Sequence, residues 1–179
     1  ELGKNAVHEM ARIIDIFQTK YAAQLKKRRH RLLGHGTISV GTVNGGLQPN
    51  IVPNYCVMTA DRRTLPGETE ATVRREIQKL LKEAGLKATI GKSKIPSGLP
   101  METDARLPLV QQFFRSIGQT RPLGVDYFCD ASILSHGGIP SIVFGPGNIA
   151  QAHTVDEWIS IKSLDRGTAM LVKFLQSLP

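Results

Sequence analysis

The apolar side chains at the start of the chain recur every three or four positions, which is the spacing of one face of an α-helix. These side chains are Val7, Met10, Ala11, Ile14, Phe17 and Tyr21. They predict one long helix from Gly3 to about Arg29. Alternating apolar and polar residues then predict two strands, over 37–43 and 51–63. A second helical pattern covers 68–84, and a third strand is predicted over 86–95.

A segment with two prolines and a glycine, Ile95–Pro100, separates this part of the chain from the rest. Such a change in composition is typical of a domain boundary, so we expect one domain over residues 1–95 and a second over 96–179. Helical periodicity and short apolar runs predict the elements of the second part. They are a helix over 107–117, a short strand over 122–125, a helix over 130–135 capped by Asp130, a buried strand over 140–144 and an amphipathic helix over 161–178.

These elements predict an α/β chain. The first part, helix–strand–strand–helix–strand, has the order of a ferredoxin-like split βαβ domain that lacks its first strand. The second part alternates helix and strand as a parallel α/β layer does, with too few strands to close a sheet. Both parts are therefore expected to be incomplete at one edge, which earlier sequence or another chain would supply.

The composition is that of a globular protein, with 41% hydrophobic and 21% charged residues. No apolar run approaches the roughly 20 residues that span a bilayer, so no membrane association is expected. Two cysteines, Cys56 and Cys129, make neither a disulfide framework nor a zinc knuckle. A reducing, cytoplasmic setting is predicted.

The net charge of +8 raises the question of an anionic partner. Much of the excess lies in one run, Lys26–Arg31, which has no interleaved aromatic residue and no zinc or helix-turn-helix pattern around it. The run also ends a predicted helix, where cations complement the helix dipole. We therefore predict a solvated helix end and no nucleic-acid partner. Phosphate binding by this run and binding of a small anionic substrate remain alternatives.

The segment Phe144–Glu157 places a histidine, His153, on a loop just beyond the predicted strand. A histidine in such a position can meet a metal or a substrate, and the nearby Asp156 and Glu157 can fix its tautomer. The alternative is a surface histidine beside two helix-capping acids. One histidine and two adjacent acids do not complete a zinc site. The other metal-ligating residue types nearby are Cys129, Asp130 and His136.

Two further segments carry candidate binding residues. In Gly45–Pro53, turn residues hold Asn50, whose amide can polarise a carbonyl in acyl transfer or can simply satisfy the turn. At the end of the second strand, Arg62 and Arg63 alternate faces, so one can point inward while the other is solvated. An arginine fork holds a carboxylate with two hydrogen bonds, although Asp61 can pair with it as a structural bridge.

Four motifs in this order resemble the M20 group of metal-dependent aminoacylases and carboxypeptidases. This group includes acetylornithine deacetylase, succinyl-diaminopimelate desuccinylase and the glutamate-releasing carboxypeptidases. The motifs are Gly3–Ala6, Gly45–Gly46 with Asn50–Pro53, Asp61–Arg63 with Pro66–Glu68, and Gly145–Gly147 with Ala150–His153 and Asp156–Glu157. The last is most similar to the acetylornithine deacetylase branch. The resemblance covers nearly the whole chain but only the later half of the family pattern.

The resemblance implies a role for three residues. His153 matches the last metal ligand of a two-zinc site, in which cobalt can substitute. Asn50 and Arg63 match lid-domain residues that reach the substrate, in this family often from the partner subunit. Arg63 would hold the substrate carboxylate, and Asn50 would help bind or polarise the scissile acyl group. Asp130 falls near a substrate-side segment without a firm role. In the family a metal-bound water attacks the amide carbonyl and a glutamate acts as general base.

The earlier family motifs, H-x-D, a later Asp and a Glu-Glu pair that holds the general base, do not occur here. The resemblance therefore implies a lid and dimerisation domain followed by the closing part of a three-layer α/β catalytic domain like that of zinc peptidases. We assign no catalytic residue, and we expect the chain alone neither to hold two zinc ions nor to turn over substrate.

The resemblance implies that the chain is a portion of an amidohydrolase that removes N-acyl groups from amino acids. It would form a homodimer through the lid domain and act on a small N-acyl amino acid. The alternative is a dimerisation or interaction module without catalysis. The two hypotheses are compatible if the lid domain makes the enzyme dimeric.

Overall fold

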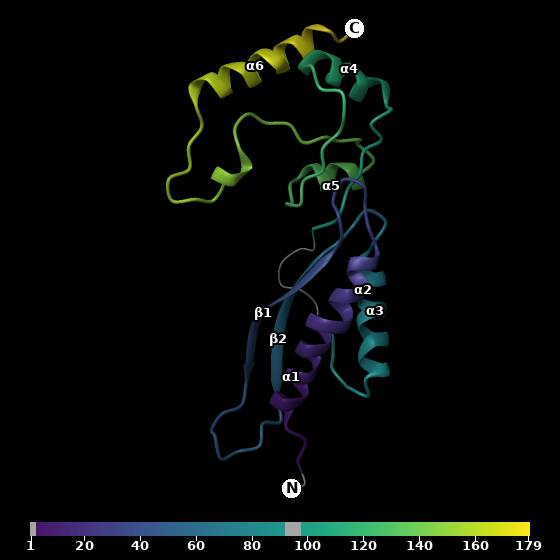
Figure 1. The fold of residues 1–179 in the computed structure, drawn as a ribbon, viewed down its shortest axis with the longest axis vertical. Helices are drawn as coiled ribbons and strands as arrows, with labels where there is room; N and C mark the ends of the chain where they lie inside the picture. Colours follow the sequence, from purple (N-terminus) through teal and green to yellow (C-terminus); the bar gives the residue numbers. More distant parts are fainter. Residues whose placement is uncertain (1–2, 92–97) are drawn as a thin grey trace. The chain divides into compact units, whose positions relative to one another are not determined.

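The computed structural model describes residues 3–91 and 98–179 (Figure 1). The chain forms two compact units. Unit 1 comprises Glu1–Met101 with Val125–Cys129, and unit 2 comprises Glu102–Gly124 with Asp130–Pro179. The predicted boundary between residues 95 and 96 lies outside the described residues, so the division into domains 1–95 and 96–179 remains a prediction.

Unit 1 begins with one continuous helical segment, as predicted. It consists of α1 (Ala6–Ile16), a π-helical turn η1 (Phe17–Tyr21) and α2 (Ala22–Lys27). The helix begins at Ala6 rather than at Gly3 because the Asn5 side chain accepts two backbone hydrogen bonds of the first turn, at 3.0 and 3.1 Å, and so caps it. The π-helical turn was not predicted.

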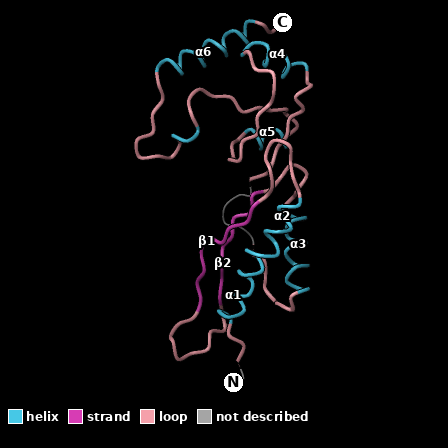
Figure 2. Tube along the Cα trace, viewed as in Figure 1, coloured by secondary structure: helices cyan, strands magenta, loops and turns pink. Residues whose placement is uncertain are grey.

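The two predicted strands form an antiparallel hairpin, β1 (Thr37–Gly45) and β2 (Cys56–Arg63), with Thr37 opposite Arg63 (Figure 2). The second strand begins at Cys56 rather than at residue 51. Pro53 has no backbone N–H to donate to a ladder, and its carbonyl accepts from the N–H of Ala6 at 2.8 Å. Residues 46–55 are therefore a loop.

The second predicted helix is confirmed as α3 (Glu70–Glu83). Thr69 and Thr72 form a capping box at its start, with hydrogen bonds of 3.2 and 2.8 Å. The predicted strand over 86–95 is wrong for 86–91, where no strand forms, and 92–95 lie outside the described residues. The carbonyls of residues 90 and 91 accept hydrogen bonds from the Arg74 guanidinium at 3.0 and 2.8 Å, in place of a neighbouring strand.

The core of unit 1 lies between the helices and one face of the hairpin. Its buried members are Met10, Ile13, Ile16, Phe17, Tyr21, Leu25, Leu80, Leu81 and Leu86. Ile38, Val40 and Met58 of the hairpin pack against them. The predicted apolar stripe was partly wrong, since Ala11 is exposed and Ile13 and Ile16 are buried.

Unit 2 contains the three helices predicted for the second part. They are α4 (Pro108–Ile117), α5 (Ala131–His136) and α6 (Ile161–Gln176), with a short 3₁₀ turn η2 (Ile149–Gln151) before α6. Helices α4 and α6 share an aromatic cluster. In this cluster the Phe113 ring meets those of Phe144 and Phe174 edge-on, with centroids 5.1 and 4.9 Å apart.

Three expectations for the second part of the chain, residues 96–179, are wrong. No strand forms over 122–125 or 140–144, because an extended segment needs a neighbouring strand to pair its backbone and the described part of unit 2 offers none. Asp130 makes no capping hydrogen bond, since its own backbone is already helical, with φ −61° and ψ −18°.

The α/β class is confirmed, with a mixture of helices and one small antiparallel sheet in the described residues. Within that part of the chain, no helix is both long and apolar enough to cross a membrane.

The core predicts a strong dependence of stability on Leu25, whose side chain is 1% exposed. Leu25→Ala leaves a cavity and is expected to lower the free energy of unfolding by about 2–5 kcal/mol. Leu47 is 90% exposed, so Leu47→Ala should change it by less than about 0.5 kcal/mol. Urea denaturation of both variants checks this. Equal effects of the two substitutions would contradict the packing described.

Candidate functional site

The loop between β1 and β2 lines an open hollow with a volume of about 500 Å³. Residues 45–53 form most of its lining, and Asn5 and Val7 complete it. Asn50 lies in this lining and is exposed. Within the described residues its side chain makes no hydrogen bond to the turn, so the alternative that Asn50 merely satisfies the turn is not supported. The amide is available to a ligand.

Arg63 ends β2 and is exposed, as the alternation predicted for one of the two arginines. Its guanidinium lies 3.1 Å from the Asp61 carboxylate, with 57% and 58% of the two side chains exposed. Such a solvated pair contributes at most about 1 kcal/mol. Asp61 therefore does not prevent an incoming carboxylate from binding to Arg63.

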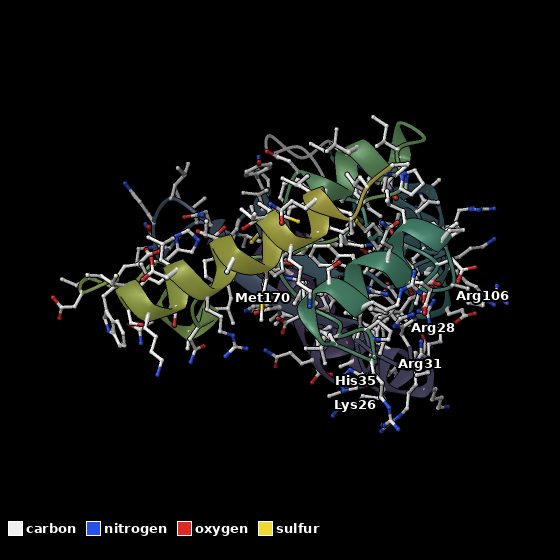
Figure 3. The ribbon with its side chains drawn as sticks, turned by 90° about the horizontal axis from the view of Figure 1, so that it is seen from above. Lys26, Arg28, Arg31, His35, Arg106 and Met170 are labelled. Carbon is white, nitrogen blue, oxygen red and sulfur yellow. The ribbon has the colours of Figure 1, made fainter. Side chains whose placement is uncertain are left out.

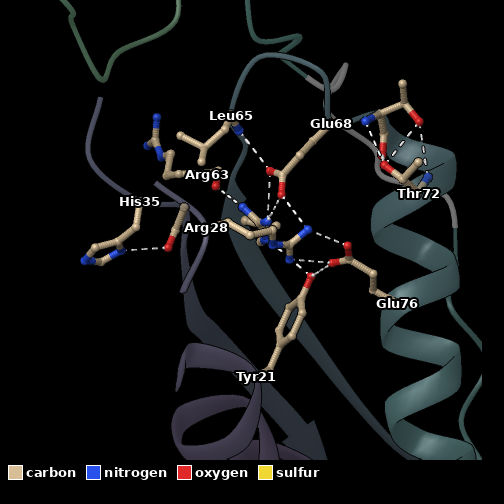
Figure 4. Close-up of polar contacts among 11 residues, drawn as sticks. Tyr21, Arg28, His35, Arg63, Leu65, Glu68, Thr72 and Glu76 are labelled. Carbon is tan, nitrogen blue, oxygen red and sulfur yellow. Dashed lines mark hydrogen bonds and ion pairs between the residues drawn. The ribbon is translucent and has the colours of Figure 1, made fainter. Parts of the chain in front are cut away.

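Arg62 lies on the other face of β2, and its side chain is 8% exposed. Figure 4 shows Tyr21 and Glu68, which are its partners. The Arg62 guanidinium donates to both carboxylate oxygens of Glu68, at 2.8 and 2.9 Å, and to the Tyr21 hydroxyl at 3.3 Å. It also donates to the carbonyl of Arg63. One of the two arginines is thus fixed inside unit 1 while its neighbour stays in solvent.

A second layer of polar contacts surrounds this arginine. Arg28 binds both carboxylate oxygens of Glu76, at 2.5 and 2.9 Å, and approaches Glu68 at 3.0 Å. The Tyr21 hydroxyl donates to Glu76 at 3.1 Å. Arg28 holds the pKa of the Glu76 carboxyl below its ordinary value, and burial raises the pKa of the Tyr21 phenol.

This polar network was missed from the sequence. Strand alternation indicated that one arginine of β2 faces inward, and an inward arginine needs a carboxylate partner. That signal could have raised the question, but it does not identify Glu68 and Glu76 as the partners.

The network also accounts for one cation of the basic run. Arg28 is held by glutamates, whereas Lys26 and Arg31 are exposed (Figure 3). Lys27 and Arg29 are exposed as well. A solvated helix end fits this arrangement. The absence of a nucleic-acid partner remains a prediction.

His153 lies in unit 2, after η2, with its backbone in the left-handed region at φ 62°. Its backbone N–H donates to the Glu157 carboxylate at 3.0 Å. The acid therefore fixes the loop through the main chain, and no described contact joins it to the ring as the sequence suggested. Both side chains are exposed.

The described residues do not fit a metal ion. They contain no group of three or more histidine, cysteine, aspartate or glutamate side chains that could hold one. His153 is thus a lone candidate ligand, and Cys129, Asp130 and His136 do not gather into a set with it. Zinc requires three or four ligands.

Asn50 and Arg63 both belong to unit 1 but lie at opposite ends of the hairpin. Asn50 is in the loop after Gly45, which pairs with Cys56, whereas Arg63 is at the far end of β2. β2 has 8 residues. At about 3.3 Å per residue, the two ends of the strand are more than about 20 Å apart. One small substrate cannot contact both residues of the same chain.

Comparison with known proteins identifies the class. Residues 1–89 match the family described as the peptidase dimerisation domain of M20 peptidases. The chain is 27% identical to the acetylornithine deacetylase of Myxococcus xanthus over 144 residues, which are 76% of this chain and 37% of that protein. It is 28% identical to that of Aliivibrio fischeri (strain MJ11) over 179 residues, which are 97% of this chain and 47% of that protein.

The fold agrees with these matches. An M20 family metallo-carboxypeptidase from Sulfolobus solfataricus aligns with a TM-score of 0.59 and 21% identity, over 98% of this chain and 45% of that one. A tripeptidase from Staphylococcus aureus aligns with a TM-score of 0.62 and 19% identity, over 95% and 44%. Residues 1–89 therefore belong to the M20 dimerisation-domain family, and the chain spans less than half the length of these relatives. M20 peptidases are metal-dependent hydrolases.

The lowered pKa of Glu76 predicts acid-sensitive stability. Its contribution is complete above the ordinary pKa of glutamate, and it is lost as the pH falls through the lowered pKa of the folded state. Glu76→Gln should therefore reduce the loss of stability between about pH 7 and about pH 3. Urea denaturation at both values measures this.

Glu83→Gln is the matched control for that experiment. Glu83 is on the same helix, 60% exposed, and its paired cation, Lys79, is 3.8 Å away. This variant should keep the acid dependence of the unsubstituted chain. If Glu76→Gln also kept it, the Arg28–Glu76 contact would not be a determinant of stability.

Proposed function

We propose that this chain is a portion of a metal-dependent amidohydrolase that removes the acyl group from N-acyl amino acids, as acetylornithine deacetylase does. The observation that carries the proposal is the similarity to the Aliivibrio fischeri acetylornithine deacetylase over 97% of the chain. An N-acetyl-L-citrulline deacetylase of Xanthomonas campestris, 27% identical over 72% of this chain and 36% of that protein, supports the same substrate class.

In this proposal Arg63 binds the substrate carboxylate, because its fork is exposed and only loosely paired. Asn50 contacts the acyl group from the hollow beside the β1–β2 loop. His153 is one ligand of a zinc site in which cobalt can substitute. The remaining ligands and the general base come from sequence outside this chain, so the chain alone is inactive.

A homodimer follows from the same assignment. Since Asn50 and Arg63 of one chain lie at opposite ends of the hairpin, a substrate that contacts both takes them from two copies. The match of residues 1–89 to a peptidase dimerisation domain supports this arrangement. A cytoplasmic location is also proposed, and no nucleic acid or membrane is part of the function.

The same match favours a second candidate, a dimerisation module without catalysis. Light scattering that shows a dimer, combined with no hydrolysis in the experiment below, would favour this candidate.

The enzyme hypothesis predicts that activity returns when the chain is joined to an upstream half carrying the H-x-D, Asp and Glu-Glu segments of the family. With zinc or cobalt, the joined protein is expected to hydrolyse N-acetyl amino acids. His153→Ala should abolish hydrolysis and lower the bound zinc. Arg63→Ala should raise KM by about tenfold or more, which corresponds to about 1.4 kcal/mol, with a smaller effect on kcat.

Arg106→Ala is the control for Arg63→Ala. Arg106 is also paired with a nearby aspartate, at 2.8 Å, and its side chain is 90% exposed in unit 2. It should leave KM unchanged. Absence of hydrolysis in the metal-loaded joined protein would reject the enzyme hypothesis.

The shared site predicts complementation between two impaired variants, measured at a substrate concentration well below the KM of Arg63→Ala. Asn50→Ala and Arg63→Ala joined proteins should each be impaired, and an equal mixture after subunit exchange should regain about a quarter of the normal sites. Each mixed dimer has one site with an intact Arg63 from one copy and an intact Asn50 from the other. If the mixture showed only the mean activity of the two variants, both residues would belong to the same chain or to no site.

A further inference from the structure

We propose that Arg62 is a positioning residue for Arg63, which fixes the backbone at the end of β2 so that the exposed guanidinium can take a carboxylate. This inference rests on the proposed role of Arg63 in substrate binding. Arg62 itself is 8% exposed and contacts no candidate ligand. Its effect on the substrate would pass entirely through its neighbour.

One contact of Arg62 reaches the main chain of Arg63, and the others hold the guanidinium in place. A buried guanidinium keeps its charge, so it needs a carboxylate, and Glu68 supplies both oxygens at 2.8 and 2.9 Å. The remaining terminal nitrogen, Nη1, donates to the carbonyl of Arg63. The guanidinium thus joins the end of the strand to Glu68.

Glu68 closes the turn that follows. Its carboxylate accepts from the Leu65 N–H at 2.9 Å, and its own N–H donates to the Leu65 carbonyl at 3.0 Å. Gly67 allows this return with φ 89°, a conformation that a side chain would strain. The five residues after Arg63 therefore form a closed turn. The Arg63 carbonyl is held at one end of this turn and the Glu68 side chain at the other.

A third contact comes from the residue before β1. Gly36 is buried, and a Cβ there would collide with the Arg62 guanidinium and would lie 2.8 Å from the Arg63 carbonyl oxygen. The chain at Gly36 thus packs directly against this contact and leaves the Arg62 side chain no room to move toward it.

Because of the geometry of a strand, the contacts of Arg62 also set the direction of the Arg63 side chain. Adjacent residues of a strand point to opposite faces, so an Arg62 that is held inward leaves Arg63 facing outward. On that outer face the only described charge partner of Arg63 is Asp61. Without the Arg62 contacts, the last residue of β2 would lose its main side-chain restraint, and a substrate carboxylate would have to order it.

The test uses the joined protein and compares an N-acetyl amino acid with the matching substrate whose carboxylate is a carboxamide. Arg62→Lys keeps the charge but cannot make the forked contacts. It should lower the preference for the carboxylate substrate at least fivefold, through KM, with kcat changed less than twofold. A general loss of stability would instead affect both substrates equally.

Arg74→Lys is the matched control. Arg74 also lies in unit 1, pairs with a glutamate at 2.7 Å and donates to backbone carbonyls, but it does so at residues 90 and 91. It should lower thermal stability without changing the substrate preference. If Arg62→Lys does not fold, Glu68→Gln provides the same measurement, because it weakens the Arg62 pair while it keeps the shape of the side chain.

The outcomes separate this inference from the proposed function. If Arg63→Ala itself leaves the preference for the carboxylate unchanged, the proposed role of Arg63 is wrong. If Arg63→Ala removes the preference but the Arg62 and Glu68 variants retain it, Arg63 binds the substrate and the positioning role of Arg62 is wrong.

Discussion

The buried charge of Arg62 is the constraint around which unit 1 is arranged. A guanidinium cannot lose its proton to escape burial, so it must be neutralised where it lies. Glu68 provides that neutralisation, and Arg28 in turn shares Glu68 with Arg62. Glu76 then balances Arg28. The chain of alternating charges joins the end of the first helical segment, the second strand and the third helix.

Such a network stabilises one arrangement more than it stabilises the folded state as a whole. Replacing a buried ion pair by apolar residues is often neutral, whereas removing one partner costs about 3–5 kcal/mol because the other charge is left unpaired. The network in unit 1 spans elements that are far apart in sequence. A packing in which α3 was shifted along the hairpin would separate Glu68 or Glu76 from its arginine, so the charges select the observed packing.

The helix prediction was right in kind, but it placed the exposed Ala11 in the buried face and missed the π-helical turn. The buried positions Phe17, Tyr21 and Leu25 are spaced by four. In a regular α-helix each such step rotates the side chain by about 40°, so the stripe would leave the core. The wider turn at Phe17–Tyr21 absorbs this rotation and keeps Tyr21 directed at Glu76 and Arg62. Periodicity assumes a constant turn and cannot show this.

The strand errors have a different physical cause. The residues over 140–144 are apolar enough to predict a buried strand, yet Ile142, Val143 and Phe144 are 36–40% exposed. A strand depends on a partner strand elsewhere in the chain. A local pattern can show that a segment suits a strand, but it cannot show that a partner strand is present. The β1–β2 hairpin was predictable because both partners lie within one short stretch of sequence. The caps at the starts of α1 and α3 are equally local, but they were not predicted.

The candidate site also has features that depend on local sequence and features that depend on distant sequence. Alternation correctly predicted that one of the two arginines faces inward and the other solvent, because it is a local property of one strand, but it did not say which. The partners of Arg62 and any further ligands around His153 depend on distant sequence and were not predictable. The hairpin adds a constraint of its own, since its length separates Asn50 from Arg63. If both residues bind one substrate, dimerisation is part of the binding site, and the enzyme and dimerisation-module hypotheses describe two aspects of the same domain.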